Sequence, residues 1–419
     1  MNFNLKQINM QKLFITLALT IICLSMNAQT AYIADWGTST VTVVNVATGK
    51  VTDTINVGGY PTGVSVSPDG NKVYVANWGD GTISVISTAA DTVLATIPVT
   101  GFPEGVDVSP NGKKLYVVNN DGSGIVSVIN TTTYLVIDTI AAGAEYSEGI
   151  AVSTDGSKVY VADYQNNTVN VIDTLTNTVS ATIPVSNEPF GIAVSPDGKK
   201  VYVANSSENL VSVINTANNT VIDTIEVGSY PMGLTVSPDG SKVYVANNGT
   251  NPSVSVISTS TETVTATISI VTSGGEPYAL SVSPDGAKLY VTNIGGGTDS
   301  TVTIINTATN TISSEISVDG YPYSLGNFIS KHTYTAGIAP LSLLSANMDV
   351  YPNPASNNLT VESAVNGVID IINIQGQLIQ TLPTSRNKTN IDMSSYPSGV
   401  YFLEIRTDKG LEVKKFVKE

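Results

Sequence analysis

The sequence predicts an all-β protein, a seven-bladed β-propeller followed by a small C-terminal β-sandwich. A unit of about 42 residues, exemplified by residues 60–99, recurs with small changes almost to residue 330. Each unit holds four short runs rich in Val, Ile, Thr and Tyr, which alternate in polarity or are briefly apolar, as half-buried strands are. Four antiparallel strands in every repeat are typical of propeller blades, which bury their faces against neighbouring blades.

Turn chemistry separates the strands of each unit. Between the first two runs of the unit stands Ser67-Pro68-Asp69-Gly70, in which Pro presets φ and Asp can hydrogen-bond to the nearby backbone. We expect Gly70 to be left-handed, because glycine adopts positive φ without a Cβ clash. An Asn or Asp ends every second strand, as Asn77 does, and we expect it to cap its loop.

Two recurring sequence features predict the number of blades. A turn centred on Pro, or on Ser147 in one repeat, recurs seven times between Tyr60-Pro61 and Tyr321-Pro322, and a second strand beginning with Tyr recurs seven times between Tyr32 and Tyr290. The two sets are offset, since the chain begins at a second strand and residues 321–330 form a first strand without partners. We expect residues 31–57 to supply those partners, so that both ends complete one blade and close the ring.

The repeated Tyr-Val-Ala-Asn strand and Ser-Pro-Asp-Gly turn resemble the YVTN family of seven-bladed propellers over about 300 residues. That family occurs in bacterial and archaeal surface proteins and is akin in fold to some lactonases. The resemblance implies the fold of residues 29–330 but no single activity, because folds of this kind host many functions.

Residues 1–28 are predicted to be a signal peptide. They contain Lys6 and Lys12, no acidic residue, and an apolar stretch from Leu13 to Met26 that is too short to span a bilayer. We expect cleavage after Ala28, export to the periplasm and no transmembrane segment in the mature chain. The one Cys lies in the removed part, so the mature protein would have neither disulfides nor thiol chemistry.

A linker at residues 331–346 precedes a different pattern at residues 347–419, which consists of strands without the 42-residue period. The segment resembles the type A C-terminal sorting domain of the type IX secretion system. The motifs that carry the resemblance are a Tyr-Pro-Asn-Pro start, a turn from Ile372 to Gln377, a Pro-Ser-Gly-Val-Tyr step and a basic end; their key residues are Tyr351, Pro352, Asn353, Pro354, Gly399, Tyr401, Lys414 and Lys415. The resemblance implies a β-sandwich read by the type IX machinery at the outer membrane, with the cargo secreted or attached to the surface; an adhesive Ig-like module is the alternative.

In residues 29–330, basic and acidic side chains are expected on opposite faces of the predicted propeller. This segment holds 9 Lys, no Arg and 26 acidic residues, a net charge of −17. Eight Lys follow the turns between first and second strands, which share one face of a propeller. The connections on the opposite face hold no Lys or Arg but many acids and aromatic rings. A segment this acidic disfavours nucleic acid, whose binding requires several phosphates to be neutralised.

We predict that this acidic, aromatic face binds a ligand, because loops on a rigid scaffold carry binding residues and large rings with polar tips suit recognition. For a single residue the alternative is structural, a ring that covers the neighbouring blade or an acid that solvates a loop. The candidate residues are Trp36, Tyr60, Trp78, Phe102, Glu104, Tyr146, Glu148, Tyr164, Glu188, Phe190, Tyr230, Glu276, Tyr278 and Tyr323.

The residue types argue against catalysis in the propeller. The only His, His332, falls in the linker, which excludes His-based acid–base chemistry and His-ligated metals from the repeats. The sequence therefore predicts a non-enzymatic, cofactor-free protein that binds an extracellular glycan, a cationic peptide or another protein, or a divalent ion. Two alternatives stay open: a structural surface-layer protein, and a lactonase-like hydrolase with a divalent cation held by non-repeating acids, namely Glu104, Glu148, Glu188 and Glu276.

Overall fold

The computed structural model describes residues 27–144, 146–270, 275–295, 300–318, 320–330, 334–335, 349–363, 367–373, 378–384, 387–407 and 410–419. The chain divides into two compact units, Met1–Ala336 and Gly337–Glu419. Of the predicted signal peptide, only β1 (Asn27–Ala28) is described, paired with β29 (Tyr334–Thr335) from the predicted linker. The remainder of the predicted signal peptide and His332 lie outside the described residues.

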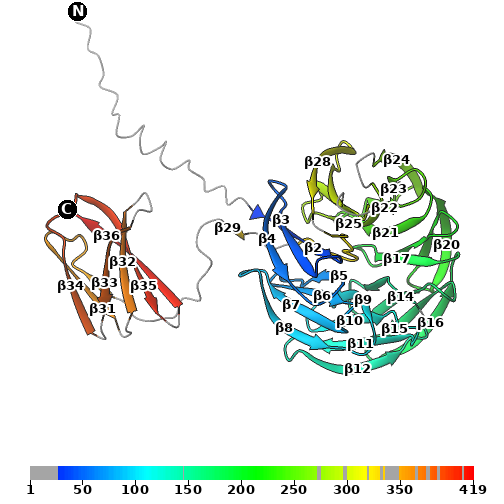
Figure 1. The fold of residues 1–419 in the computed structure, drawn as a ribbon, viewed down its shortest axis with the longest axis horizontal. Coiled ribbons are helices and arrows are strands. Elements are labelled where there is room, and N and C mark those ends of the chain that lie inside the picture. Colours follow the sequence, from blue (N-terminus) through cyan, green and yellow to red (C-terminus); the bar gives the residue numbers. More distant parts are fainter. Residues whose placement is uncertain are drawn as a thin grey trace, which may run out of the picture. The chain divides into compact units, whose positions relative to one another are not determined.

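The first unit is all-β and is built from repeated antiparallel sheets that follow one another around a circle in chain order (Figure 1). Within each sheet the strands pair in sequence order. The six four-stranded sheets are β5 (Pro61–Val66), β6 (Lys72–Asn77), β7 (Thr82–Ser87), β8 (Thr92–Pro98); β9 (Pro103–Val108), β10 (Lys114–Asn119), β11 (Ile125–Asn130), β12 (Leu135–Ala141); β13 (Ile150–Val152), β14 (Lys158–Asp163), β15 (Thr168–Asp173), β16 (Thr178–Pro184); β17 (Pro189–Val194), β18 (Lys200–Asn205), β19 (Leu210–Asn215), β20 (Thr220–Glu226); β21 (Pro231–Val236), β22 (Lys242–Asn247), β23 (Ser253–Ser258), β24 (Thr263–Ser269); and β25 (Pro277–Val282), β26 (Lys288–Asn293), β27 (Thr301–Asn306), β28 (Thr311–Ser317).

A three-stranded sheet comes from the N-terminal part: β2 (Thr30–Asp35), β3 (Thr40–Asn45) and β4 (Lys50–Asn56). Residues 321–330 lie beside β2, with bridges from Asp35 to Pro322 and from Ala31 to Ile329. Elsewhere the Pro that begins a first strand pairs with the Asn that ends the second, as Pro61 pairs with Asn77. The bridge of Pro322 to Asp35 thus resembles this Pro-to-Asn pairing of the four-stranded sheets.

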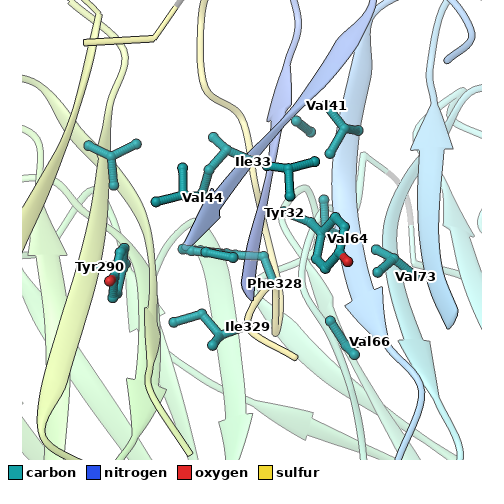
Figure 2. Close-up of a cluster of buried hydrophobic side chains, with 14 of the residues drawn as sticks. Tyr32, Ile33, Val41, Val44, Val64, Val66, Val73, Tyr290, Phe328 and Ile329 are labelled. Atoms are coloured by element: carbon teal, nitrogen blue, oxygen red, sulfur yellow. The ribbon is translucent and has the colours of Figure 1, made fainter. Parts of the chain in front are cut away.

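The hydrophobic core runs between sheets. One cluster joins Tyr32 of β2 to Tyr290 of β26 and Val64 of β5, with the side chain of Phe328 among them (Figure 2). The Tyr that begins the apolar part of each second strand is at most 1% exposed in all seven repeats: Tyr32, Tyr74, Tyr116, Tyr160, Tyr202, Tyr244 and Tyr290. The fourth strands are mostly exposed, as in β8. Stability thus comes from sheet-to-sheet burial, as expected for a repeat protein.

The Ser-Pro-Asp-Gly turns have the predicted chemistry. Gly70 has a φ of +74°, which confirms its left-handed conformation. The hydroxyl of Ser67 donates to Asp69 Oδ1 at 2.6 Å, and the same oxygen accepts the amide of Asn71 at 3.1 Å. The turn is therefore fastened by its own side chains.

The lysines that follow these turns link one sheet to the next. Lys158 Nζ donates to the carbonyl of Thr216 at 2.8 Å, and Lys288 Nζ donates to the carbonyl of Val46 at 2.6 Å. Four more make the same contact: Lys72 with Thr131, Lys114 with Thr174, Lys200 with Thr259 and Lys242 with Thr307. The Lys288 contact joins the last four-stranded sheet to the N-terminal sheet, so this row of cations has a structural role.

Glycines let the first strands of successive sheets approach each other at the centre. A Cβ on Gly105 would lie 1.9 Å from the carbonyl oxygen of Glu148, and one on Gly149 would lie 2.0 Å from that of Phe190. The glycines and apolar side chains of these strands surround a narrow axial cavity of about 40 Å³. The close approach requires glycine because any Cβ would overlap the neighbouring backbone.

The second unit contains two antiparallel sheets around one hydrophobic cluster. The three-stranded sheet orders β30 (Asp349–Tyr351), β31 (Asn358–Ser363) and β34 (Asn387–Asp392). The four-stranded sheet orders β33 (Leu378–Thr384), β32 (Gly367–Asn373), β35 (Gly399–Thr407) and β36 (Gly410–Lys418). Leu359, Ile371, Leu403 and Phe416 are fully buried between them.

Candidate functional site

One position in every repeat lines a hollow of about 420 Å³ at one end of the axial cavity. It is the residue that directly follows the Pro, or Ser147, of the recurring turn. Glu148 lines both the hollow and the axial cavity, so the two spaces adjoin. The seven residues are Thr62, Glu104, Glu148, Phe190, Met232, Tyr278 and Tyr323.

The residue before the Pro has a distinctive backbone. It is exposed in most of the turns and often left-handed, as in Tyr60 at φ +53° and Tyr230 at φ +55°. Its carbonyl accepts the amide that follows the second strand, as the Tyr60 carbonyl does from Trp78 at 3.1 Å. Side chains two residues apart share one side of a regular strand, so Tyr60 and Thr62 would face the same way if the strand were regular, yet only Thr62 lines the hollow.

The other five lining residues complete an aromatic wall. Four directly follow the Asn or Asp at the end of a second strand, and one is a residue before a Pro: Trp36, Trp78, Asn120, Tyr164 and Tyr230. Seven of the twelve lining side chains are aromatic, which is unusual for a solvent-facing surface and typical of binding pockets.

The rings contact one another across sheet boundaries. Trp36 stacks on Tyr60 at a centroid distance of 4.4 Å, and Trp78 stacks on Phe102 at 4.9 Å. Further along, Tyr323 lies 4.4 Å from Tyr278. The structural reading, that rings cover the neighbouring sheet, therefore holds for these residues, and Trp36 and Trp78 line the hollow as well.

Glu104 is a buried acid in the hollow. Its side chain is 6% exposed, and its Oε2 accepts a hydrogen bond from the amide of Asn120. Burial raises the pKa of the Glu104 carboxyl from its ordinary value of 4.5 to about 7, although the Asn120 bond opposes the shift. This acid therefore changes charge near neutral pH.

Glu148 is the second acid. Its Oε2 accepts the hydroxyl of Tyr278 at 2.8 Å. Burial, and then the charge of Glu104, raise the pKa of the Glu148 carboxyl well above its ordinary value, while the bond from Tyr278 opposes them. The two acids are electrostatically coupled, so the first ionisation makes the second harder.

The structure brings together nine of the fourteen candidate residues: Trp36, Trp78, Glu104, Glu148, Tyr164, Phe190, Tyr230, Tyr278 and Tyr323. The other five do not line the hollow although Tyr230, which holds the same turn position before a Pro, does: Tyr60, Phe102, Tyr146, Glu188 and Glu276. The sequence groups Glu188 and Glu276 with Glu104 and Glu148 as candidate cation ligands, but only Glu104 and Glu148 line the hollow.

Sequence reasoning missed Thr62, Asn120 and Met232, because only rings and acids were selected. A signal was available, since Thr62 and Met232 occupy the same repeat position as Glu104 and Tyr278. Asn120 occupies the position of Trp78 in the next repeat. Alignment of the seven repeats by their turns would have found all three.

The Asn or Asp at the end of each second strand has a structural role. Asn77 is fully buried, and its Nδ2 donates to Ser84 Oγ in the adjacent strand at 2.9 Å. Asp163 also accepts the backbone amide of Asn166 at 3.1 Å, which is the predicted loop cap. These residues hold the loops that carry the aromatic wall.

Carboxyl groups are the candidate metal ligands in the part of the chain that the structure describes. Among those residues no group of three or more His, Cys, Asp or Glu side chains is close enough to hold a metal ion. Glu104 and Glu148 contribute two carboxyl groups to the hollow, and the aromatic rings add no strong oxygen ligand.

The predicted sorting motif fastens the start of the second unit to its last strand. Asn353 Oδ1 accepts the amide of Val417 at 3.0 Å, and the amide of Ala355 donates to the carbonyl of Val417 at 2.7 Å. Tyr351 packs its ring beneath Lys388, and Tyr401 stacks on Phe416. Pro352 and Pro354 flank Asn353, Gly399 pairs with Lys418, and Lys414 and Lys415 are exposed on β36.

These features define the class: a propeller-like array of repeated sheets with a hollow on its axis, joined to a separate two-sheet unit. Residues 349–419 match the family model of the secretion system C-terminal sorting domain. This match confirms the sorting domain and implies handling by the type IX machinery, export, and a secreted or cell-surface location.

Solved structures resemble the array in fold. Hydrazine synthase of Kuenenia stuttgartiensis is 24% identical with a TM-score of 0.58, covering 63% of this chain and 88% of that chain. A functionally unknown protein from Desulfotomaculum acetoxidans is 18% identical with a TM-score of 0.59, covering 72% and 98%. At these identities the similarity concerns the propeller-like fold alone.

No curated protein matches the chain in a comparison of sequences. Among the residues that the structure describes, no helix has the length and apolar character needed to cross a membrane.

Proposed function

We propose that the first unit is a seven-bladed propeller of YVTN type whose hollow binds an extracellular ligand without converting it. In this proposal residues 321–330 complete the blade begun by β2, β3 and β4, and the bridges to Asp35 and Ala31 support this closure. Residues 1–28 act as the signal peptide, and the second unit is the β-sandwich read by the type IX machinery.

One observation carries the binding proposal: the repeats diverge in side-chain type at the position that surrounds the hollow. Framework positions keep one residue type, as the seven buried Tyr of the second strands do. The position after the Pro instead varies among Thr, Glu, Phe, Met and Tyr. A position needed only for packing would favour one solution in every repeat, whereas a ligand site needs different groups at different points around it.

The chain carries its own reporter for this test. It has two Trp residues, and both line the hollow. The purified full-length chain is titrated with N,N′-diacetylchitobiose, cellobiose, cadaverine and calcium chloride while Trp emission is followed. The proposal expects at least one probe to change the emission saturably, and expects Trp36→Phe and Trp78→Phe to weaken that probe's binding measured by calorimetry.

The exposed Leu175→Ala variant is the matched control, because Leu175 is 92% exposed and lies outside the hollow. Absence of a response to every probe would overturn the proposal, as would binding that neither Trp variant alters. If the same sample hydrolysed a lactone probe, the lactonase-like alternative would take the place of the binding proposal.

A further inference from the structure

We propose that the hollow binds a primary alkylammonium group, held by Glu104 and Glu148 on one side and by aromatic faces on the other. This inference rests on the proposed function and specifies the chemistry of its ligand. It goes beyond a general preference for cations, because the wall and the acids together select an organic ammonium ion.

The first argument is the unmatched charge. Glu104 and Glu148 line one hollow, yet none of its twelve lining residues is Lys, Arg or His. Glu104 is buried and Glu148 is half-buried. Carboxyl groups shielded from water without a cationic partner are unfavourable when ionised, and an opposite charge in the hollow relieves that cost. An anionic ligand would add to the repulsion instead.

The second argument is hydrogen-bonding capacity. Asn120 bonds Oε2 of Glu104, and Tyr278 bonds Oε2 of Glu148. Among the described residues, the Oε1 atom of each carboxyl accepts no hydrogen bond, although Glu104 is only 6% exposed. A primary ammonium group has three N–H donors and can serve both atoms.

The third argument is the aromatic wall of the hollow. Aromatic faces attract cations through their quadrupoles, most strongly when the site is shielded from water. Tyr278 and Phe190 are 4% and 5% exposed and contact each other edge to face. Because Tyr278 also bonds Glu148, one cation can contact a carboxyl group and a ring together.

A metal ion fits this site less well than an organic cation. Two carboxyl groups supply at most four oxygens, whereas Ca²⁺ takes six to eight oxygen ligands. The apolar rings that fill the rest of the wall would shield the methylene groups of an amine from water, which favours an alkyl chain behind the charge.

The experiment compares cadaverine with 1,5-pentanediol, a neutral molecule of similar shape, on the full-length chain at pH 8 by calorimetry and Trp emission. We expect saturable binding of cadaverine and none of the diol. We expect Glu104→Gln and Glu148→Gln each to weaken cadaverine binding about tenfold or more, the scale of one charged hydrogen bond. Glu226→Gln is the matched control, since Glu226 is exposed on β20 and lies outside the hollow.

Two further probes define the ammonium ion and its source. Tetramethylammonium should bind more weakly than cadaverine, because it donates no hydrogen bond. Tighter binding of Nα-acetyl-lysine N-methylamide than of cadaverine would assign a lysine side chain of a peptide as the ligand, and weaker binding a free amine.

Equal binding of the diol would overturn the inference, as would undiminished binding in both Gln variants. If a Gln variant fails to fold, the comparison of cadaverine with the diol on the unmodified chain decides. A saccharide response without a cadaverine response leaves the proposed function standing and removes this inference. No response to any probe removes both.

Discussion

The hydroxyl of Tyr278 donates to Glu148 at 2.8 Å although 130 residues separate them in the chain. Tyr278 belongs to β25 and Glu148 lies just before β13, and two complete sheets lie between these strands in the sequence. The bond therefore crosses the hollow instead of joining neighbouring sheets. It positions one acid of the site and ties together parts of the molecule that are not adjacent.

Loss of this bond should destabilise the first unit. Tyr278→Phe keeps the ring but removes the only hydrogen bond to Glu148 among the described residues, and we expect it to lower the free energy of unfolding by about 1–3 kcal/mol. Urea unfolding followed by circular dichroism measures the change. Tyr323→Phe is the matched control, because Tyr323 lines the hollow without a hydrogen bond of its hydroxyl in the described residues. Equal losses in the two variants would contradict a specific role for the Tyr278 bond.

Stability should fall as the pH rises from about 4.5 to about 7. Burial raises the pKa of Glu104 from 4.5 to about 7, so within this window the folded chain holds a proton that the unfolded chain has lost. The resulting loss from this one group is at most about 3 kcal/mol between pH 4.5 and pH 8. Urea midpoints across this range measure it, and Glu104→Gln should flatten the profile. Greater stability at pH 8 in the unmodified chain would contradict the assignment.

A methyl group added where the first strands approach each other around the axial cavity should destabilise the first unit. Gly149→Ala places a methyl group 2.0 Å from the carbonyl oxygen of Phe190, and we expect a loss of about 1–3 kcal/mol or more. Ala279→Gly is the matched control, because Ala279 occupies the same position of its repeat and should lose only about 0.5–1 kcal/mol. Thermal melts of the two variants give the comparison. A smaller loss for Gly149→Ala would show that the strands can separate.

The lysines that follow the turns and bond to the next sheet should contribute to stability and not to ligand binding. Lys158→Met keeps the aliphatic stem but removes the bond to the carbonyl of Thr216, and we expect a loss of about 1 kcal/mol in urea unfolding. Lys199→Met should change little, because Lys199 is exposed and its ion pair is with Asp197 of its own turn. Binding of the probe that the hollow accepts should be unaffected in both variants.

The sorting domain should be required for delivery. A chain that ends before Asp349 lacks residues 349–419, and we expect it to accumulate in the periplasm of a host with a working type IX system. Immunoblots of cell fractions measure the distribution, with the full-length chain as the control. Normal secretion of the shortened chain would contradict the role of the domain.

The repeat made the strands predictable from sequence. Polarity alternation and Ser-Pro-Asp-Gly turns give the same four strands in each repeat, as in β5 to β8, because both signals are local. Tyr32 and its six counterparts in the other repeats could likewise be identified as one recurring position of the second strands, and all seven are buried. The resemblance of residues 349–419 to a sorting domain was confirmed for similar reasons, since its motifs are short and specific.

The site was only partly predictable, because it depends on side-chain direction. Tyr60 and Thr62 lie two residues apart in the same turn, yet only Thr62 lines the hollow. Tyr230 has the turn position and the left-handed conformation of Tyr60 and does line the hollow, so composition and turn position together do not reveal which side chain faces it. The link from Lys158 to Thr216 was equally hidden, since it joins residues from different repeats.

The pairing of β2 with residues 321–330 orders events during biogenesis. Phe328 packs in the same cluster as Tyr32, and the amide of Tyr32 donates to its carbonyl at 2.8 Å. These contacts of the first sheet therefore cannot form until residues 321–330 have been synthesised. Contacts between distant parts of a chain form slowly, because a long loop must close first. The two ends of the first unit should therefore meet late in folding, after the local pairs of strands within each sheet have formed.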